Sequence, residues 1–356
     1  MDRRSLLLWL AAPSALANAQ ARSGLSFPID FGAHPQTRTE WWYVTGSLRS
    51  AARLWGFQVT FFRSSTGIAA AAGSRFGPTQ LLFAHAALTD LEAKRLRHDQ
   101  RIARSGFGIA AARSDDTGIV LRDWQMSRTP LPDDARLSRY RAQVASDSAG
   151  FAFELQFDAT QPVLLQGDAG VSKKGPGAAE TSRYYSEPQL AVSGSLTLDG
   201  TPISVAGRAW LDHEWSDAFM PPQAVGWDWI GMNLDDGSAL TAFRLRRADG
   251  SAVYAGGSLR RAGEAVRNFG PDEVTFTPGR IWESSASRAR YPVQWTIDTP
   301  AGRFDVNALL DNQELDSRGS SGAIYWEGLS DLLDSAGRRV GRGYLEMTGY
   351  AAALRL

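Results

Sequence analysis

Apolar and polar residues alternate over many short stretches of this chain, and we find no long amphipathic helical pattern after the N-terminal segment. Alternation, or an excess of aromatic and β-branched residues, marks four stretches as strands: residues 56–62, 151–157, 190–198 and 293–297. Turn-forming pairs separate such stretches, among them Asp199-Gly200, Asp236-Gly237 and Asp249-Gly250. Regular strands joined by short turns predict an all-β protein built from barrels or sandwiches.

The second half of the chain repeats motifs of the first half in the same order, which indicates an internal duplication. Residues 207–212 (GRAWLD) return as residues 341–346 (GRGYLE), and Gly194 and Gly328 share the same offset. Three earlier matches keep this order: Trp42 with Trp229, residues 82–84 with residues 253–255, and Trp124 with Trp282. We therefore expect two antiparallel β domains in tandem, at residues 22–218 and 219–356.

The first residues, 1–21, have the pattern of a signal peptide. Arg3 and Arg4 precede a short apolar run, and Ala19-Gln20-Ala21 forms a small-x-small cleavage site. The arginine pair is typical of twin-arginine export. We expect a periplasmic or secreted protein, soluble after cleavage, because no later apolar run reaches the roughly 20 residues that span a bilayer.

Composition removes several functional classes. The 356 residues include 38 Lys and Arg against 38 Asp and Glu, so the chain lacks the excess positive charge that is typical of nucleic-acid-binding proteins. It has no cysteine, which excludes disulfides, thiolate catalysis and cysteine-bound metals. The four histidines lack metal-binding spacing, and neither a nucleotide-binding motif nor a G-x-S-x-G motif is present. We expect no cofactor; a zinc site of His85, His213 and a carboxylate is the minor alternative.

Three clusters place carboxylates beside indole rings: residues 40–43 (EWWY), 210–215 (WLDHEW) and 227–229 (WDW). Successive residues of a strand face opposite ways, so Asp212 and Glu214 share one face and His213 lies on the other. In the third cluster the two tryptophans share a face opposite to the aspartate. Each cluster therefore offers an acidic group next to aromatic rings.

A carboxyl group packed against aromatic rings is poorly solvated, so its pKa rises and it can donate a proton near neutral pH. Such an acid can protonate a carbon–carbon double bond while the rings stabilise the resulting carbocation, after which water adds. The alternative is structural, with Asp228 and Glu40 paired to arginines such as Arg244. Residues 212–214 (DHE) are favoured for chemistry because the second copy reads EMT at the matching residues 346–348.

At these residues the sequence resembles the AttH/CrtC family. The resemblance covers nearly the whole mature chain and keeps the order of seven segments: residues 40–46, 57–63, 83–86, 183–186, 212–215, 226–229 and 325–328. It implies two lipocalin-like barrels. It also implies kinship with carotenoid 1,2-hydratases, a fungal isoflavonoid hydratase, pericyclases and exported proteins, many of which are encoded with transporter components.

We expect a hydrophobic, isoprenoid- or lipid-like ligand and hydration of one of its double bonds, as in the carotenoid 1,2-hydratases. The acid would be Asp212 or Asp228, and Glu214 or His213 would orient water. The expected ligand-binding residues are Glu40, Trp42, Tyr43, His85, Tyr185, Trp210, Trp227 and Trp229. An eight-stranded barrel can hold one small ligand, and the cavity lies either inside the first barrel or between the two.

Two alternative functions stay open. The first is a periplasmic lipid carrier, or an accessory protein of a membrane export transporter, that performs no chemistry. The second is a secreted hydrolase in which Asp212 and Glu214 act on a glycosidic bond, although adjacent positions on one face of a strand flank a substrate poorly.

Overall fold

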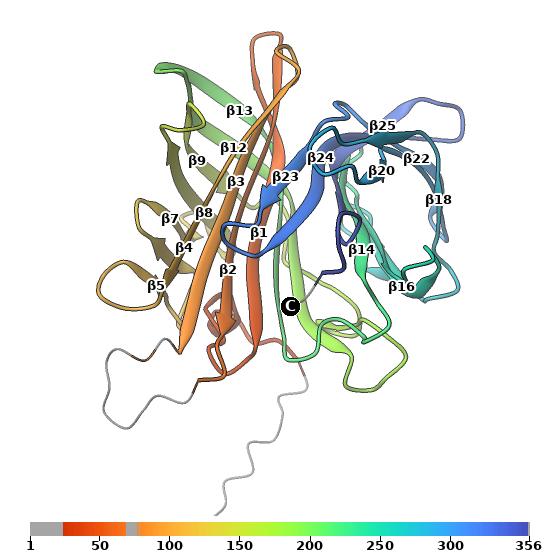
Figure 1. Cartoon of the computed structure of the whole chain (residues 1–356), viewed down its shortest axis with the longest axis horizontal. Helices are drawn as coiled ribbons and strands as arrows, with labels where there is room; N and C mark the ends of the chain where they lie inside the picture. The colour runs from red at the N-terminus through yellow and green to blue at the C-terminus, as the bar shows by residue number, and fades with distance from the viewer. Residues whose placement is uncertain (1–23, 69–76, 78, 355–356) are drawn as a thin grey trace, which may run out of the picture.

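The computed structural model describes residues 24–68, 77 and 79–354. Two large antiparallel sheets lie side by side (Figure 1). Thirteen strands form the first sheet, a nearly closed barrel, and ten form the second, while β19 and β20 make a separate ribbon. The described residues include a short 3-10 helix, η1, at Ile29–Phe31. The all-β fold with two barrels is thus confirmed, whereas the expected signal peptide, residues 1–21, lies outside the described residues.

The first barrel contains strands β1 to β13. Their bounds are Thr39–Ser50 (β1), Arg53–Ser65 (β2), Gln80–Asp90 (β3), Arg95–Arg104 (β4), Ala110–Ala112 (β5), Gly118–Leu121 (β6), Trp124–Leu131 (β7), Asp134–Ser146 (β8), Phe151–Asp158 (β9), Leu164–Leu165 (β10), Val171–Lys173 (β11), Thr181–Leu198 (β12) and Thr201–Ser216 (β13). Asp199 and Gly200 both have positive φ and form the predicted turn between β12 and β13.

The remaining strands, β14 to β25, form the second barrel, apart from the separate ribbon of β19 and β20. Their bounds are Gly226–Leu234 (β14), Ala239–Arg246 (β15), Ala252–Arg260 (β16), Arg267–Phe269 (β17), Thr275–Pro278 (β18), Ile281–Glu283 (β19), Arg290–Pro292 (β20), Gln294–Thr299 (β21), Gly302–Ala308 (β22), Glu314–Ser317 (β23), Ala323–Leu333 (β24) and Arg339–Met347 (β25). Residues 217–225 connect the two barrels; whether residues 22–218 and 219–356 fold independently stays a prediction.

Burial separates the strands that face solvent from those that lie between the barrels. Along β9 every second residue is buried, because one face packs on the core of the first barrel and the other faces outward. Along β14 nearly every residue is buried, and in β1 the five consecutive residues 42–46 are all buried, because both faces are covered there. In β1, Trp42 and Val44 enter the core of the first barrel, whereas Trp41 and Tyr43 face the second barrel.

The barrels meet along these doubly buried strands. β1 packs against β25, and β13 packs against β14. Aromatic side chains fill the junction, including Tyr43 and Trp210 from the first barrel and Trp229 and Tyr344 from the second. The rings of Tyr43 and Trp229 meet edge to face, with centroids 5.5 Å apart. The junction is therefore an apolar core of its own.

The two sheets share one strand order, which confirms the duplication. The first runs β4-β3-β2-β1-β13-β12-β9-β8-β7, and the second runs β17-β16-β15-β14-β25-β24-β22-β21-β18. β1 is thus equivalent to β14, β12 to β24 and β13 to β25. Ala84 of β3 and Ala255 of β16 occupy equivalent register positions, as the motif order predicts.

Strand register corrects one expected match by a single residue. Tyr43 of β1 pairs with Asp212 of β13, and Trp229 of β14 pairs with Glu346 of β25. Trp229 is therefore the counterpart of Tyr43 and not of Trp42. Since neighbouring residues of a strand face opposite ways, this shift decides which aromatic side chains face the junction.

Two further expected matches are wrong. Gly328 corresponds in register to Glu187 and not to Gly194, because the hairpin of β12 and β13 is the longer one. From Glu187 to its partner Leu211 there are 24 positions, against 17 from Gly328 to its partner Leu345. Trp124 begins β7, whereas Trp282 lies in the separate ribbon of β19 and β20, so they are not equivalent.

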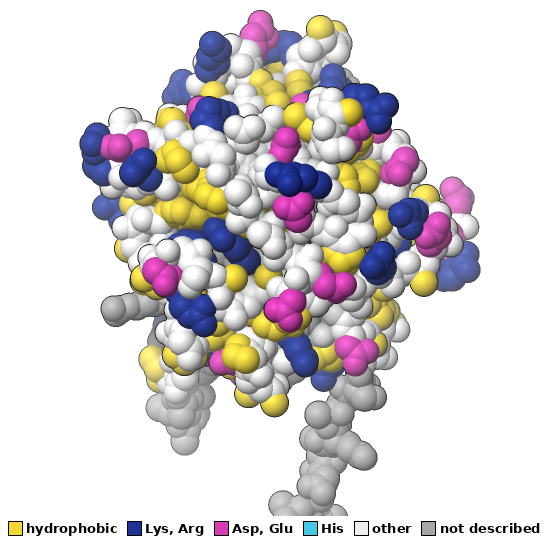
Figure 2. Space-filling view, turned by 90° about the vertical axis from the view of Figure 1, so that its right-hand side faces the viewer, with side chains coloured by type: hydrophobic (Ala, Val, Ile, Leu, Met, Phe, Trp, Pro, Cys, Tyr) yellow, Lys and Arg dark blue, Asp and Glu magenta, His cyan; other side chains and the backbone are white. Residues whose placement is uncertain are grey.

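The outer surface of the second barrel intersperses basic and acidic side chains (Figure 2). This agrees with the balanced composition of the chain. Within the described ranges, no helix has the length and apolar character needed to span a membrane.

Candidate functional site

A cavity of about 280 Å³ lies between the two barrels. Strands β1, β2, β3, β12 and β13 contribute one wall, and β14, β15, β24 and β25 contribute the other. Much of the lining is aromatic, including Trp41, Tyr43, Trp227, Trp229, Phe243 and Tyr325. Of the two locations that the sequence left open, the structure thus has a cavity between the barrels.

Besides Glu40, four acidic side chains line this cavity. Asp212 and Glu214 come from one face of β13, as strand alternation predicts, while Glu327 and Glu346 come from β24 and β25. Glu327 is the direct register partner of Glu346, so their carboxyl groups leave neighbouring backbone positions. The cavity therefore combines aromatic walls with an unusual concentration of buried acid.

Asp212 is held by neutral donors. Its Oδ1 accepts hydrogen bonds from Ser186 Oγ at 2.5 Å and from Trp210 Nε1 at 2.7 Å. Burial raises the pKa of Asp212 to about 7; hydrogen bonds from Ser186, Trp210 and Tyr184 oppose the rise, and the charge of Glu214 adds to it. Asp212 can therefore exchange a proton near neutral pH.

Glu327 and Glu346 form the cross-strand glutamate pair. Burial raises the pKa of Glu346 to about 7, with further contributions from Asp212 and Glu214. Burial and the neighbouring Glu346 raise the pKa of Glu327 well above its usual range. Hydrogen bonding by Trp227 opposes the rise for Glu346, and the Tyr43 hydroxyl opposes it for Glu327. Among the described residues, however, neither Oε1 of Glu327 nor the Tyr43 hydroxyl has a hydrogen-bond partner of normal geometry. The pair thus holds protons more tightly than exposed glutamates do.

Glu214 differs because a lysine neutralises it. Lys174 Nζ lies 2.7 Å from Oε1 of Glu214, and both side chains are buried. Ser182 Oγ donates a hydrogen bond to the same oxygen. Lys174 also packs on the rings of Tyr184 and Phe243. Burial still raises the pKa of Glu214, against the opposing charge of Lys174.

His213 lies on the opposite face of β13, inside the first barrel. Its Nε2 is 2.9 Å from Oε1 of Glu40, and its Nδ1 is 3.1 Å from the Tyr185 hydroxyl. Its ring stacks on Trp42 with centroids 4.4 Å apart. Burial lowers the pKa of His213 to about 4, against the effect of Glu40, so the imidazole is neutral at physiological pH. His213 does not line the cavity.

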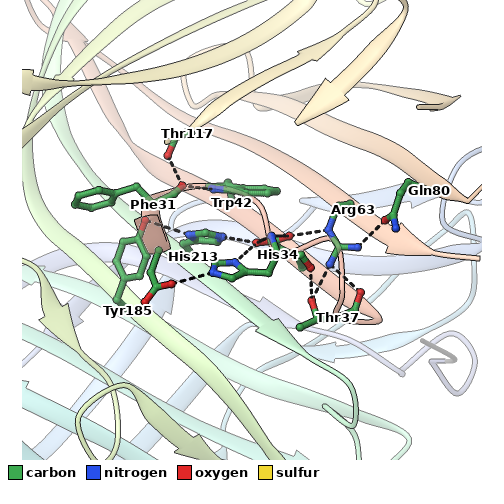
Figure 3. A network of polar contacts seen from close by, with 11 residues as sticks. Phe31, His34, Thr37, Trp42, Arg63, Gln80, Thr117, Tyr185 and His213 are labelled. Atoms are coloured by element: carbon green, nitrogen blue, oxygen red, sulfur yellow. Dashed lines mark hydrogen bonds and ion pairs between the residues drawn. The ribbon is translucent and has the colours of Figure 1, made fainter. Parts of the chain in front are cut away.

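Glu40 joins His34, Arg63 and His213 in one polar network (Figure 3). Its carboxylate lies 2.7 Å from Nδ1 of His34 and accepts a 2.7 Å hydrogen bond from Nε of Arg63. Burial acts to raise the pKa of Glu40, but the hydrogen bonds with His213 and His34 outweigh it and hold the pKa well below its usual range. Glu40 borders the cavity, yet its carboxylate is already occupied by these partners.

His34, Glu40 and His213 also bring three possible metal-ligand atoms within 4.8 Å of one another. Each of these atoms already takes part in a hydrogen bond of the network. The second ring nitrogen of His34 lies 3.2 Å from Asp30, so this ring is satisfied on both sides. Because the donor set is complete without an ion, we assign no metal to it.

His85 belongs to a different cluster, which links the barrels at the cavity. Its Nδ1 lies 2.8 Å from the Tyr325 hydroxyl and its Nε2 lies 2.9 Å from Ser320 Oγ. Burial lowers the pKa of His85 to about 3. Since both ring nitrogens face other partners, His85 and His213 do not form the zinc site considered as an alternative.

Asp228 lies inside the second barrel and does not line the cavity. Arg244 Nε is 2.7 Å from its Oδ2, Arg246 Nε is 3.5 Å from the same oxygen, and the Tyr350 hydroxyl donates to Oδ1 at 2.8 Å. This is the arginine pairing that the sequence left open. A catalytic role for Asp228 stays a prediction, and its position gives that role no support.

The predicted ligand-binding residues divide into two groups. Those that line the cavity are Glu40, Tyr43, His85, Trp227 and Trp229. Those that lie behind its wall are Trp210, which holds Asp212, and Trp42 and Tyr185, which contact His213. Sequence reasoning missed Lys174, Glu327 and Glu346. The available signal was that Glu346 occupies the same repeat position as Asp212.

Comparison with solved structures agrees with this architecture. A protein from Nitrosomonas europaea assigned to AttH has a crystal structure with 45% sequence identity and a TM-score of 0.84, covering 93% of this chain and 98% of that chain. Kievitone hydratase from Nectria haematococca has the same fold, with a TM-score of 0.69 at 16% identity over 94% of this chain and 95% of that chain.

Two curated relatives match part of the chain. Kievitone hydratase of Fusarium solani subsp. phaseoli is 24% identical over 184 residues, which is 50% of this chain and 51% of the relative. Dehydratase asqC of Emericella nidulans is 25% identical over 195 residues, or 51% and 54%. The chain thus spans about half the length of these relatives. Residues 18–350 match the AttH-like family, and this chain belongs to that family.

Proposed function

We propose that this protein is a hydro-lyase that adds water to a carbon–carbon double bond of a hydrophobic small molecule, or removes it, in the cavity between the barrels. One observation carries the proposal: Asp212 and Glu346, from different barrels, reach a pKa of about 7 in one aromatic cavity. Groups with a pKa near the working pH are effective in proton transfer. The names of the hydratase and dehydratase relatives support this reaction class.

In the hydration direction, the protonated carboxyl group of Asp212 gives its proton to one carbon of the double bond. The other carbon becomes positively charged, and the rings of Trp227 and Trp229 stabilise it. The carboxylate of Glu346 takes a proton from water as the water oxygen bonds to that carbon. The product has gained one hydrogen and one hydroxyl group, and proton exchange with solvent restores both acids. Dehydration is the same sequence in reverse.

The substrate class follows from the size and lining of the cavity. A volume of about 280 Å³ lies at the low end for ligand pockets, which hold roughly 300–1,000 Å³. We propose an isoprenoid- or lipid-like molecule that enters with one apolar end. A carotenoid would insert only a terminal unit, which is the part that a 1,2-hydratase would modify.

The experiment is conversion of a panel of prenylated phenols and short terpenes in isotopically labelled water, read by mass spectrometry. Asp212→Asn and Glu346→Gln should each lower turnover by about 100-fold or more, because each removes a proton-transfer group. Glu264→Gln, at an exposed glutamate of the second barrel, is the matched control and should retain full turnover. Undiminished turnover in both cavity variants would remove the proposed acid and base.

A carrier without chemistry is the second candidate, and the aromatic lining of the cavity favours it equally. In that case the protein, exported by the segment 1–21, delivers a lipid-like ligand to or from a membrane export transporter. Native mass spectrometry of protein purified from its own host distinguishes the two. A bound lipid that remains unmodified on long incubation, with no turnover of the panel, would favour the carrier.

A further inference from the structure

The cavity holds one more acid than the proposed reaction requires. Asp212 and Glu346 are sufficient for proton transfer, yet Glu327 stands directly opposite Glu346. Like charges in such a cross-strand position destabilise a sheet. Glu327 is only 2% exposed, and its Oε1 lacks a hydrogen-bond partner of normal geometry among the described residues. A buried polar atom left in this state costs free energy unless a ligand satisfies it.

The equivalent position of the first barrel carries a hydrogen-bond donor instead of an acid. Ser186 is the register counterpart of Glu327, and it donates a 2.5 Å hydrogen bond to Asp212 across the strands. The donor for the first-barrel acid is therefore part of the chain. In the second barrel a carboxyl group takes the place of that donor. The remaining donors are neutral: Trp227 for Glu346 and the Tyr43 hydroxyl, at poor geometry, for Glu327.

The cations that border the cavity do not supply a charged donor to the pair. Lys174 lies 2.7 Å from Glu214, and Arg63 lies 2.7 Å from Glu40. In the part of the chain that the structure describes, no ion pair neutralises the cross-strand glutamate pair. Together with Asp212, this pair leaves the cavity with acidic groups that lack a matching positive charge.

We propose that the cross-strand glutamate pair binds an organic cation: a hydrophobic amine whose ammonium group lies between Glu327 and Glu346. The N–H groups of the ammonium ion supply charge-assisted hydrogen bonds to both carboxylates, including the unpartnered Oε1 of Glu327. The hydrocarbon part of the amine contacts the aromatic walls, and the rings of Tyr43 and Trp227 favour its positive charge. The inference does not depend on the proposed reaction, since the amine can bind without being converted.

The test is isothermal titration calorimetry with three ligands that share one skeleton and differ in charge: cyclohexylmethylamine, cyclohexylmethanol and cyclohexanecarboxylate. At mildly alkaline pH the amine should bind at least about tenfold more tightly than the alcohol, and the carboxylate most weakly. In Glu327→Gln and in Glu346→Gln, the ratio of the affinity for the amine to the affinity for the alcohol should fall to near one. Glu264→Gln, the exposed control, should keep the preference of the wild type.

Thermal unfolding verifies that each variant is folded and supplies a second measurement. The amine should raise the melting temperature of the wild type more than the alcohol does, because only a ligand that binds the folded state stabilises it. Equal affinity for amine and alcohol in the wild type, or an unchanged preference in both glutamine variants, would overturn the assignment. Asp212→Asn separates the two proposals, since it should lower turnover by about 100-fold or more and retain the preference for the amine. Loss of the preference in this variant alone would also overturn the assignment.

Discussion

The two barrels place different side chains on equivalent strands at the same cavity. In the first, β12 sets Ser186 opposite Asp212, and a short hydrogen bond joins them. In the second, β24 sets Glu327 opposite Glu346, and neither residue donates to the other. Duplication has kept the strand order and the register while the facing side chains diverged. The backbone of each copy thus serves as a common scaffold, and a few cross-strand pairs determine which polar groups face the cavity.

The interiors of the two barrels, by contrast, are alike in holding a buried ion pair, and these pairs give the largest expected effect. Glu40 in the first barrel and Asp228 in the second are each paired with a largely buried arginine. Glu40→Gln and Asp228→Asn should each lower the free energy of unfolding by about 3–5 kcal/mol, because an uncompensated buried charge remains. Urea unfolding measures both. A loss below about 1 kcal/mol in either variant would show that the corresponding pair is not structural.

The free energy of unfolding should depend on pH through the buried acids of both cavity walls, and single variants should show the contribution of each. The pKa of Asp212 in the folded state, about 7, lies above its ordinary value of 3.8. The unfolded chain loses this proton first, so stability falls as pH rises from about 4 to about 7 and then levels off. At 1.36 kcal/mol per pKa unit, Asp212 contributes a loss of about 4 kcal/mol.

Urea unfolding across this pH range measures the loss. Asp212→Asn and Glu346→Gln should each make the free energy of unfolding depend less steeply on pH, because each removes one carboxyl group with a raised pKa. The exposed Glu264→Gln should leave the slope unchanged. Identical slopes in wild type and both cavity variants would contradict the elevated pKa values.

Removing the donor from the first barrel should make its acid resemble the second-barrel pair. Ser186→Ala leaves Asp212 with one fewer hydrogen bond and should destabilise the protein by about 1–3 kcal/mol above neutral pH, where the carboxylate is charged. Loss of a bond to the charged form should also raise the pKa of Asp212 further. Carboxyl chemical shifts in NMR titrations read this directly. An unchanged titration of Asp212 would show that Ser186 is dispensable.

The smallest expected effect has the opposite sign. Glu327→Gln removes one of two facing charges and should stabilise the ligand-free protein by about 0.2–1 kcal/mol at mildly alkaline pH. Near pH 4, where both glutamates hold protons, the same variant should be nearly neutral. Melting temperatures at the two pH values measure the difference, and destabilisation at alkaline pH would mean that Glu327 has a stabilising partner in the free protein.

Strand alternation was sufficient to predict the all-β class and the opposite orientations of Asp212 and His213, because it depends on neighbouring residues alone. The choice of two lipocalin-like barrels also needed the internal repeat and the resemblance to the AttH/CrtC family. The repeat offset failed at β12, since a comparison of motifs does not show that the hairpin of β12 and β13 is longer than that of β24 and β25. The packing of one barrel against the other likewise produces no periodic pattern in the sequence, so the cavity between them could not be located from it. Glu346 was therefore not among the candidate site residues, although it faces the same cavity as Asp212.

β1 contacts β25, and β13 contacts β14. Because β1 is equivalent to β14 and β13 to β25, the second contact is the first with the two copies exchanged. This is the isologous geometry of a two-fold dimer. In a pair of identical chains, every substitution at such a cavity must appear on both walls. Joining the copies in one polypeptide removes that constraint, so Ser186 and Glu327 can occupy equivalent places. A fused chain can thus give its cavity two distinguishable ends and hold an asymmetric molecule in a single orientation.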